Sequence, residues 1–109
     1  MPRLMPRMKN RTLTESELDA LLDALYRMRD GDFTVRLSPR GATRFSEVAR
    51  VLNEVFDQCE QLSNEVQRVS ETVSTDGRLS ERVSISPARG SWGQSVRALN
   101  QMLDEGSEP

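Results

Sequence analysis

The feature that most constrains the fold is an apolar seam that runs without a break through residues 48–73. Eight small or branched apolar residues recur there at alternating spacings of four and three. This heptad pattern is typical of helices that pack as left-handed coiled coils. It predicts one continuous helix from about Ser46 to about Thr75, with a seam made of Val48, Leu52, Val55, Cys59, Leu62, Val66, Val69 and Val73.

A shorter amphipathic helix is predicted before the seam. Thr14 and Glu17 have the spacing of a capping box, in which each side chain satisfies a backbone N–H of the first turn. Gly31 is expected to end this helix, because glycine adopts left-handed conformations at little cost. Apolar residues follow the cap at spacings of three and four and therefore share one face: Leu18, Leu21, Leu22, Leu25 and Met28.

A short last helix is predicted after the seam. Ser91 and Gln94 have the spacing of a second capping box, which would open this helix. Gly77 is expected to end the seam helix before it. The segments 31–45 and 77–90 contain proline and glycine and lack helical periodicity, so both are predicted to be extended connectors. The apolar face of the last helix comprises Val96, Leu99 and Leu103.

The composition argues against an enzyme. The chain has no histidine, which removes imidazole bases, histidine-containing metal sites and any phospho-accepting histidine. The single cysteine, Cys59, cannot form an internal disulfide or a thiolate cluster, and this favours a reducing, cytoplasmic setting. We therefore expect no catalytic, metal or cofactor site. Apolar residues make up 36% of the chain and aromatic residues 5%, which favours helices that complete their core with a second copy.

Charge and hydropathy limit the partners of the chain. The chain contains no run of about 18 apolar residues, so no membrane span is predicted. The net charge of −2 disfavours nucleic-acid binding. Residues 1–13 carry four basic residues and no acid, whereas the rest of the chain holds all 17 acidic residues and 11 basic ones. We interpret residues 1–13 as a disordered basic tail. The alternative is a tail that contacts an anionic membrane surface or a nucleic acid.

An internal repeat organises the chain. The first connector has glycine, then apolar residues two and six positions later, and the second connector has the same pattern. Three positions of the following helix, an arginine, a leucine (Leu52 and Leu99) and an asparagine, also recur 47 residues apart. Helix, connector and helix therefore occur twice, in predicted units 14–62 and 63–105, with a frayed end at 106–109. The repeated pairs are Gly31 and Gly77, Phe33 and Leu79, Leu37 and Val83, Arg36 and Arg82, Arg50 and Arg97, and Asn53 and Asn100.

With these residues the chain resembles the HAMP domains of bacterial and fungal signalling proteins, over about residues 14–105. The glycine and the two spaced apolar residues match the connector of that family. Glu47 stands where the family has an acidic residue at the start of its second helix, and Asn53 matches an asparagine of that helix. The segments VSTDGRLSERV and GSWGQSVRALNQM resemble the divergent HAMP repeats of hybrid histidine kinases.

The resemblance implies an all-α fold, in which two copies of the chain form parallel four-helix coiled-coil bundles. The connector would run back along each bundle, with Phe33, Leu37, Leu79 and Val83 inserted into its core. The implied function is relay of a conformational signal along a helical homodimer, as part of a two-component sensor or as its partner. The implied partners are other HAMP or histidine-kinase proteins. The resemblance further implies that the chain associates peripherally with a membrane receptor complex. The implied dimer core consists of Leu18, Leu25, the eight seam residues, Val96, Leu99 and Leu103.

The sequence also departs from the family. Membrane-adjacent HAMP domains carry a proline in their first helix after a transmembrane span, and this chain has neither. Gln94 stands where the second unit would have its acid. The expectation is therefore either a fragment of a larger protein or a free-standing partner of one. Two alternative functions stay open: an inert coiled-coil scaffold that binds a partner helix, and a small DNA-associated regulator that uses the basic tail.

Overall fold

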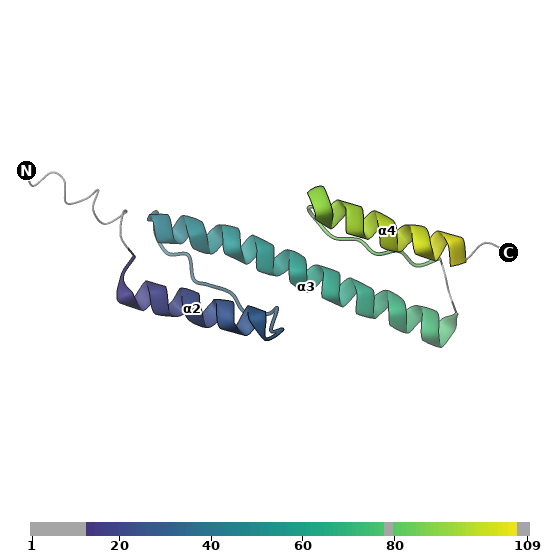
Figure 1. Cartoon of the computed structure of the whole chain (residues 1–109), viewed down its shortest axis with the longest axis horizontal. Coiled ribbons are helices and arrows are strands. Elements are labelled where there is room, and N and C mark those ends of the chain that lie inside the picture. The colour runs from purple at the N-terminus through teal and green to yellow at the C-terminus, as the bar shows by residue number, and fades with distance from the viewer. Residues whose placement is uncertain (1–12, 78–79, 107–109) are drawn as a thin grey trace, which may run out of the picture. The chain divides into compact units, whose positions relative to one another are not determined.

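The computed structural model describes residues 13–77 and 80–106. Over these residues the regular secondary structure is entirely helical, with three α-helices joined by extended connectors and no strand (Figure 1). The helices are α2 (Glu15–Arg29), α3 (Arg44–Asp76) and α4 (Gly90–Gly106). The predicted all-α class is confirmed for this part of the chain. Leu79, most of the basic tail (1–12) and the last three residues lie outside the described residues.

The first predicted helix, α2, has the predicted cap. The Thr14 hydroxyl accepts a hydrogen bond from the Glu17 amide at 3.0 Å, and the Glu17 carboxylate accepts one from the Thr14 amide at 3.0 Å. Both halves of the capping box are therefore present and satisfy the first turn. The helix ends at Arg29, and Gly31 follows with a φ of +95°, a conformation that a side chain would disfavour.

The seam residues lie on one continuous helix, α3, as predicted. It begins at Arg44 and ends at Asp76, so it is slightly longer at both ends than the heptad pattern alone indicates. Gly77 follows with a φ of +67°, and its amide donates to the Val73 carbonyl at 2.9 Å. The predicted helix stop at Gly77 is therefore confirmed.

The last helix, α4, begins earlier than the sequence indicates, and the predicted capping box of Ser91 and Gln94 is wrong. The Arg89 carbonyl accepts the amides of Trp92 and Gly93, at 3.0 and 3.4 Å. Ser91 therefore lies inside the first turn rather than before it. The physical reason is Gly90, whose φ of +52° turns the chain into the helix one residue before Ser91.

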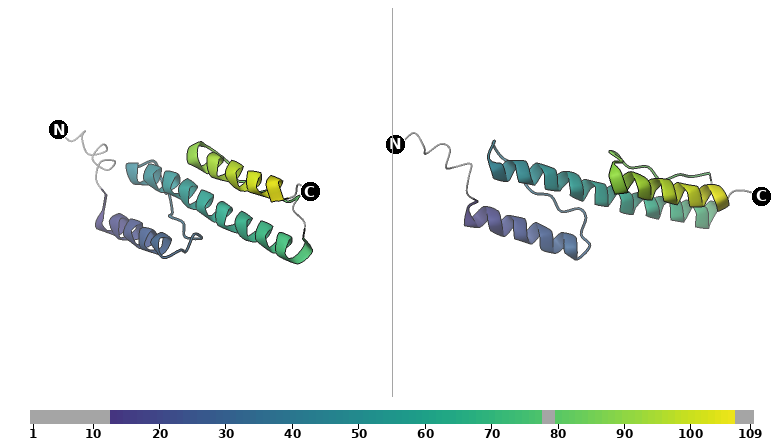
Figure 2. Two further views of the ribbon diagram at one scale, coloured as in Figure 1. Left: turned by 45° about the vertical axis from the view of Figure 1, so that its right-hand side comes forward. Right: turned by 45° about the horizontal axis from the view of Figure 1, so that its top comes forward.

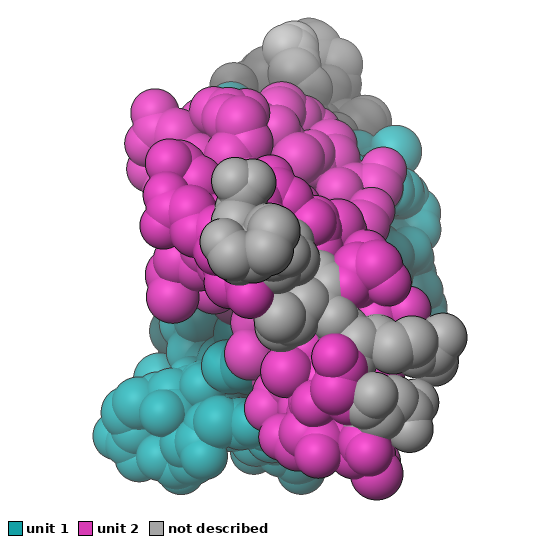
Figure 3. Space-filling view, turned by 90° about the vertical axis from the view of Figure 1, so that its right-hand side faces the viewer, with its two compact units in different colours: residues 1–57 teal, residues 58–109 magenta. Residues whose placement is uncertain are grey.

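The chain divides into two compact units, residues 1–57 and 58–109, which Figure 3 colours separately. The division falls within α3 after Asp57, whereas the repeat in the sequence places it after residue 62. Each unit contains two helical segments and one connector. Within each unit the connector runs back alongside the helices, so that both helices of the unit point in the same direction (Figures 1 and 2).

Each unit has a small apolar core, and Leu37 and Val83, from equivalent positions of the two connectors, are buried in them. The buried residues of unit 1 are Ala24, Leu37, Phe45, Ala49 and Phe56, with Leu21, Met28, Val35 and Leu52 packed against them. The buried residues of unit 2 are Val69, Val83, Ile85 and Val96, with Leu62, Val73, Trp92, Leu99 and Leu103 packed against them.

Candidate functional site

The connector of unit 1 is fastened to α3 by one asparagine. The side-chain oxygen of Asn53 accepts a hydrogen bond from the Leu37 amide at 2.8 Å, and its NH2 group donates to the Leu37 carbonyl at 3.0 Å. Both backbone groups of Leu37 are therefore satisfied, while its side chain is buried in the core of unit 1. An extended segment has no backbone ladder of its own, so such side-chain bonds satisfy polar groups that burial would leave unpaired.

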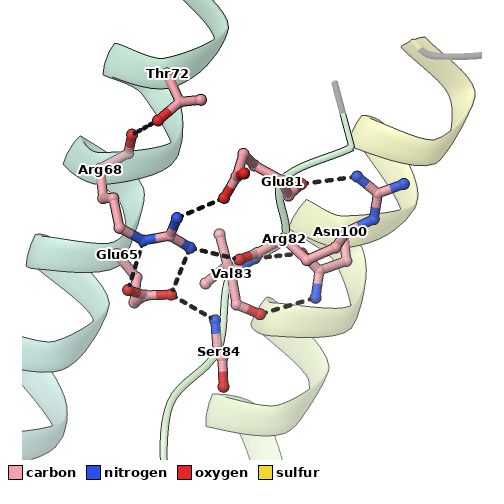
Figure 4. A network of polar contacts seen from close by, with 8 residues as sticks. All are labelled: Glu65, Arg68, Thr72, Glu81, Arg82, Val83, Ser84 and Asn100. Carbon is pink, nitrogen blue, oxygen red and sulfur yellow. Dashed lines mark hydrogen bonds and ion pairs between the residues drawn. The ribbon is translucent and has the colours of Figure 1, made fainter. Parts of the chain in front are cut away.

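Unit 2 repeats this arrangement with Asn100 (Figure 4). Its side-chain oxygen accepts from the Val83 amide at 2.7 Å, and its NH2 group donates to the Val83 carbonyl at 3.0 Å. We call the two pairs, Asn53 with Leu37 and Asn100 with Val83, the asparagine clamps. The clamped residue and its asparagine are 16 residues apart in unit 1 and 17 in unit 2. The extra residue of the second unit therefore lies between Val83 and Asn100.

An ion pair accompanies each clamp. Arg36, which precedes Leu37, lies 3.6 Å from the carboxylate of Asp57, one helical turn after Asn53. Arg82, which precedes Val83, pairs with Asp104, one turn after Asn100. The acidic member is more than half exposed in both pairs, so each contributes little to stability. The recurrence of arginine, asparagine and aspartate shows that the repeat extends to the contacts between connector and helix.

Unit 2 has a further polar network between its connector and α3, centred on Arg68 (Figure 4). The Arg68 guanidinium bonds to the carboxylates of Glu65 and Glu81, at 3.0 and 2.6 Å, and donates to the Arg82 carbonyl at 2.8 Å. Glu65 also accepts from the Ser84 amide at 2.9 Å. The hydrogen bonds that Glu65 accepts from Arg68 and Ser84 lower the pKa of its carboxylate. The hydrogen bonds to the carboxylates of Glu65 and Glu81 raise the pKa of Arg68.

Two glutamines of α3 continue this network along the same connector. The side chain of Gln61 exchanges two hydrogen bonds with the backbone of Ser86, at 2.8 and 2.9 Å. The Gln58 NH2 group donates to the Pro87 carbonyl at 2.7 Å. The connector of unit 2 is therefore fastened to both of its neighbouring helices, by the clamp on α4 and by polar side chains on α3.

The predicted connector residues occupy different environments. Leu37 and Val83 are buried in the cores and Phe33 is half-buried, whereas Leu79 falls among the residues that are not described. Gly31 and Gly77 provide the two positive-φ turns that begin the connectors. Glu47 is exposed in the first turn of α3.

The predicted dimer-core residues divide into three groups by their burial in the single chain. Val69 and Val96 are buried within unit 2, and six others are half-buried: Leu52, Cys59, Leu62, Val73, Leu99 and Leu103. Burial raises the pKa of the Cys59 thiol. The remaining five keep about two fifths of their surface or more exposed: Leu18, Leu25, Val48, Val55 and Val66.

The heptad analysis missed the residues that form the internal core of unit 1. Phe45, Ala49 and Phe56 are buried on a face of α3 different from the one that carries Val48 and Val55. Together with Leu52 they follow spacings of four, three and four, so a second apolar stripe was present in the sequence. Ala24 and Ile85 were also missed.

The sequence matches no protein-family model, and neither a curated protein nor a solved structure matches it. Over residues 13–77 and 80–106 there is no cluster of three side chains suited to holding a metal ion. None of the three described helices has the length and apolar character that crossing a membrane requires.

Proposed function

We propose that this chain is a HAMP-like signal relay, in which two copies complete each other's helical cores and pass a conformational change along the bundle axis. Three features support the proposal: the repeated connector pattern, the two asparagine clamps and an apolar surface that the single chain leaves exposed. The proposed partners are a second copy of the chain and a histidine-kinase signalling protein.

The exposed apolar stripe is the observation that carries the proposal. Leu18, Leu22 and Leu25 follow one another at spacings of four and three on α2, and each keeps more than two fifths of its surface exposed. On α3, Val48, Val51 and Val55 follow one another at spacings of three and four, and each keeps two fifths of its surface or more exposed. Burying a leucine or valine fully stabilises by about 1.5–3 kcal/mol. A second copy that covers these side chains would therefore gain much of the apolar burial that one chain lacks.

A groove in unit 2 supports the same conclusion. It has a volume of about 320 Å³ and lies between α3, the connector and α4. Val66 and Met102 line it, and both are exposed, Met102 at 66%. In the proposed dimer, apolar side chains of the second copy occupy this groove. Exposed apolar patches of this kind mark interaction surfaces in proteins.

The clamps suggest how a signal would pass. Each asparagine fixes one connector residue to the second helix of its unit, so the connector moves with that helix. Because α3 is the second helix of unit 1 and the first helix of unit 2, a rotation or shift of α3 in one unit would be imposed on the other. The small core residues Ala24, Ala49 and Val69 would allow two packings of similar energy.

The experiment that tests the relay is a fusion. The chain is inserted between a receptor and a histidine kinase, and control of kinase activity by the stimulus is measured. Retained control supports the relay, and the variant Leu25→Asp should abolish it because it places a charge in the proposed dimer core. Tyr26→Asp is the matched control, since Tyr26 is also about half exposed but contacts Arg29 outside the stripe. A dimeric fusion that never responds to stimulus would indicate the inert scaffold instead.

Cys59 provides a test of helix orientation. In a parallel dimer with the two helices in register, the two copies of Cys59 lie near each other, and mild oxidation should yield a covalent dimer. The thiolate is the reactive form, and burial raises the pKa of this thiol, so the reaction should accelerate at a more alkaline pH than for an exposed cysteine. Failure to cross-link under these conditions would argue for antiparallel or shifted pairing.

A further inference from the structure

Helix α2 contributes only a small apolar contact to unit 1. Ala24 is its single buried residue, and Leu21 and Met28 are half-buried against the same core. The three leucines of its exposed stripe each keep more than two fifths of their surface in solvent. Apolar stabilisation scales with the area removed from water, so the contact that holds α2 in its unit is weak.

The polar side chains of α2 do not add to this contact. The capping box, the ion pair of Asp23 with Arg27 and the bonds of Arg29 all lie within the helix, at its cap or at Asp30 directly after it. Among the described residues, no side chain of α2 forms a hydrogen bond or ion pair with α3 or with residues 33–43 of the connector. Moving α2 away from its unit would therefore break no such side-chain bond.

The first helical segment of unit 2 is held more firmly. Four of its side chains bond to the connector of unit 2, at distances between 2.6 and 2.9 Å: Gln58, Gln61, Glu65 and Arg68. Figure 4 shows the contacts of Glu65 and Arg68. Moving this segment away from the connector would break these bonds in addition to the apolar contact. Polar bonds of this kind therefore distinguish unit 2 from unit 1.

The turn after α2 has the properties of a hinge. Gly31 has a φ of +95°, and a Cβ added there would meet no atom within 4 Å beyond its chain neighbours. The turn is therefore not packed against the core of unit 1. The connector beyond it stays on α3, because Asn53 holds both backbone groups of Leu37. Hinges are formed by a few such residues between elements that keep their own structure.

We propose that α2 is a displaceable helix, which opens away from unit 1 about Gly31 while α3 and unit 2 stay folded. Opening uncovers the core of unit 1, which includes Phe45, Ala49 and Phe56. A molecule that binds docked α2 holds the unit closed, and one that binds the uncovered core holds it open. The inference goes beyond the proposed relay and does not rest on it, because it concerns contacts inside one unit.

Native-state hydrogen exchange of the full chain, followed by NMR, tests this opening. A helix of 15 residues is marginal by itself in water, so the amides of displaced α2 exchange with solvent. Thr14→Ala removes the cap of α2, and losing such a cap accelerates exchange through an opening of that helix by about fivefold. We expect this acceleration at residues 24–28, in the second half of α2, and unchanged rates at the slowest amides of α3 and α4.

The reciprocal variant is Gly93→Ala, which destabilises unit 2. It should leave the exchange rates of residues 24–28 unchanged, because these amides exchange through the opening of α2 alone. All three chains are compared at one protein concentration, so that any second copy on the stripe acts on each of them alike. Equal acceleration of α2, α3 and α4 in either variant would overturn the proposal, because α2 would then open only with the whole chain. Acceleration confined to the first turn of α2 would overturn it as well, since that result indicates fraying.

Discussion

Replacing Asn100 with alanine should destabilise unit 2 more than its half-buried position suggests. The substitution removes both bonds of the clamp and leaves the amide and the carbonyl of Val83 without their partner. Val83 is only 4% exposed, so water reaches these groups poorly. A buried polar group left unsatisfied costs about 1–3 kcal/mol. With two such groups and some access of water through the space that the side chain vacates, we expect a loss of about 2–4 kcal/mol.

Hydrogen exchange measures this loss where it occurs. The Val83 amide should exchange about 30-fold faster or more in the Asn100→Ala variant, which is the factor that corresponds to 2 kcal/mol. Urea unfolding gives the accompanying change in overall stability. Gln101→Ala is the matched control, because Gln101 is the next residue of α4 and its side chain bonds only to the exposed Glu105 among the described residues. Exchange at Val83 that differs by less than about twofold between the two variants would refute the clamp's energetic role.

Three further predictions follow from the packing and the charges. Gly93→Ala should destabilise the chain by about 1–3 kcal/mol in urea unfolding, because the added Cβ would lie 2.7 Å from the backbone oxygen of Ala88. Ser91→Ala is the control at an exposed position, and equal urea midpoints for the two variants would contradict the close approach. Phe56→Ala should cost about 3–5 kcal/mol in urea unfolding, since Phe56 is 2% exposed, whereas Tyr26→Ala, at a position that is 50% exposed and outside the stripe, should cost much less. The lowered pKa of Glu65 means that its stabilising contribution is present above its ordinary pKa and is lost as the pH falls through the folded value. The stability difference between the unsubstituted chain and Glu65→Gln should therefore be largest near neutral pH and shrink as the solution is acidified below the ordinary pKa of a glutamate; a difference independent of pH would refute the role of the charge.

The sequence predicted the helices well because their signals are local. The capping box at Thr14, the heptad run of α3 and the glycines that end α2 and α3 each act within one turn or along one face. The start of α4 was wrong because a serine and a glutamine at capping distance compete with Gly90, whose positive φ begins the helix earlier. That conformation leaves no mark in the pattern of polar residues.

The candidate site was predictable only in part. The repeat identified Asn53 and Asn100 as equivalent residues, but their bonds to Leu37 and Val83 join positions 16 and 17 residues apart. The partner of each asparagine therefore depends on how the connector returns along the helix. The network around Arg68 depends on that same return. A heptad count likewise places all seam residues on one face, although packing within each unit buries Val69 and leaves Val66 exposed.

The native mass in solution, measured by light scattering after size exclusion over a range of concentrations, tests the central claim most directly. The proposed relay predicts a dimer, with twice the 12.3 kDa mass of the chain, which Leu25→Asp converts to monomer and Tyr26→Asp does not. A stable, folded monomer at every concentration would contradict the account, because the exposed stripes of α2 and α3 would then be free of a second copy.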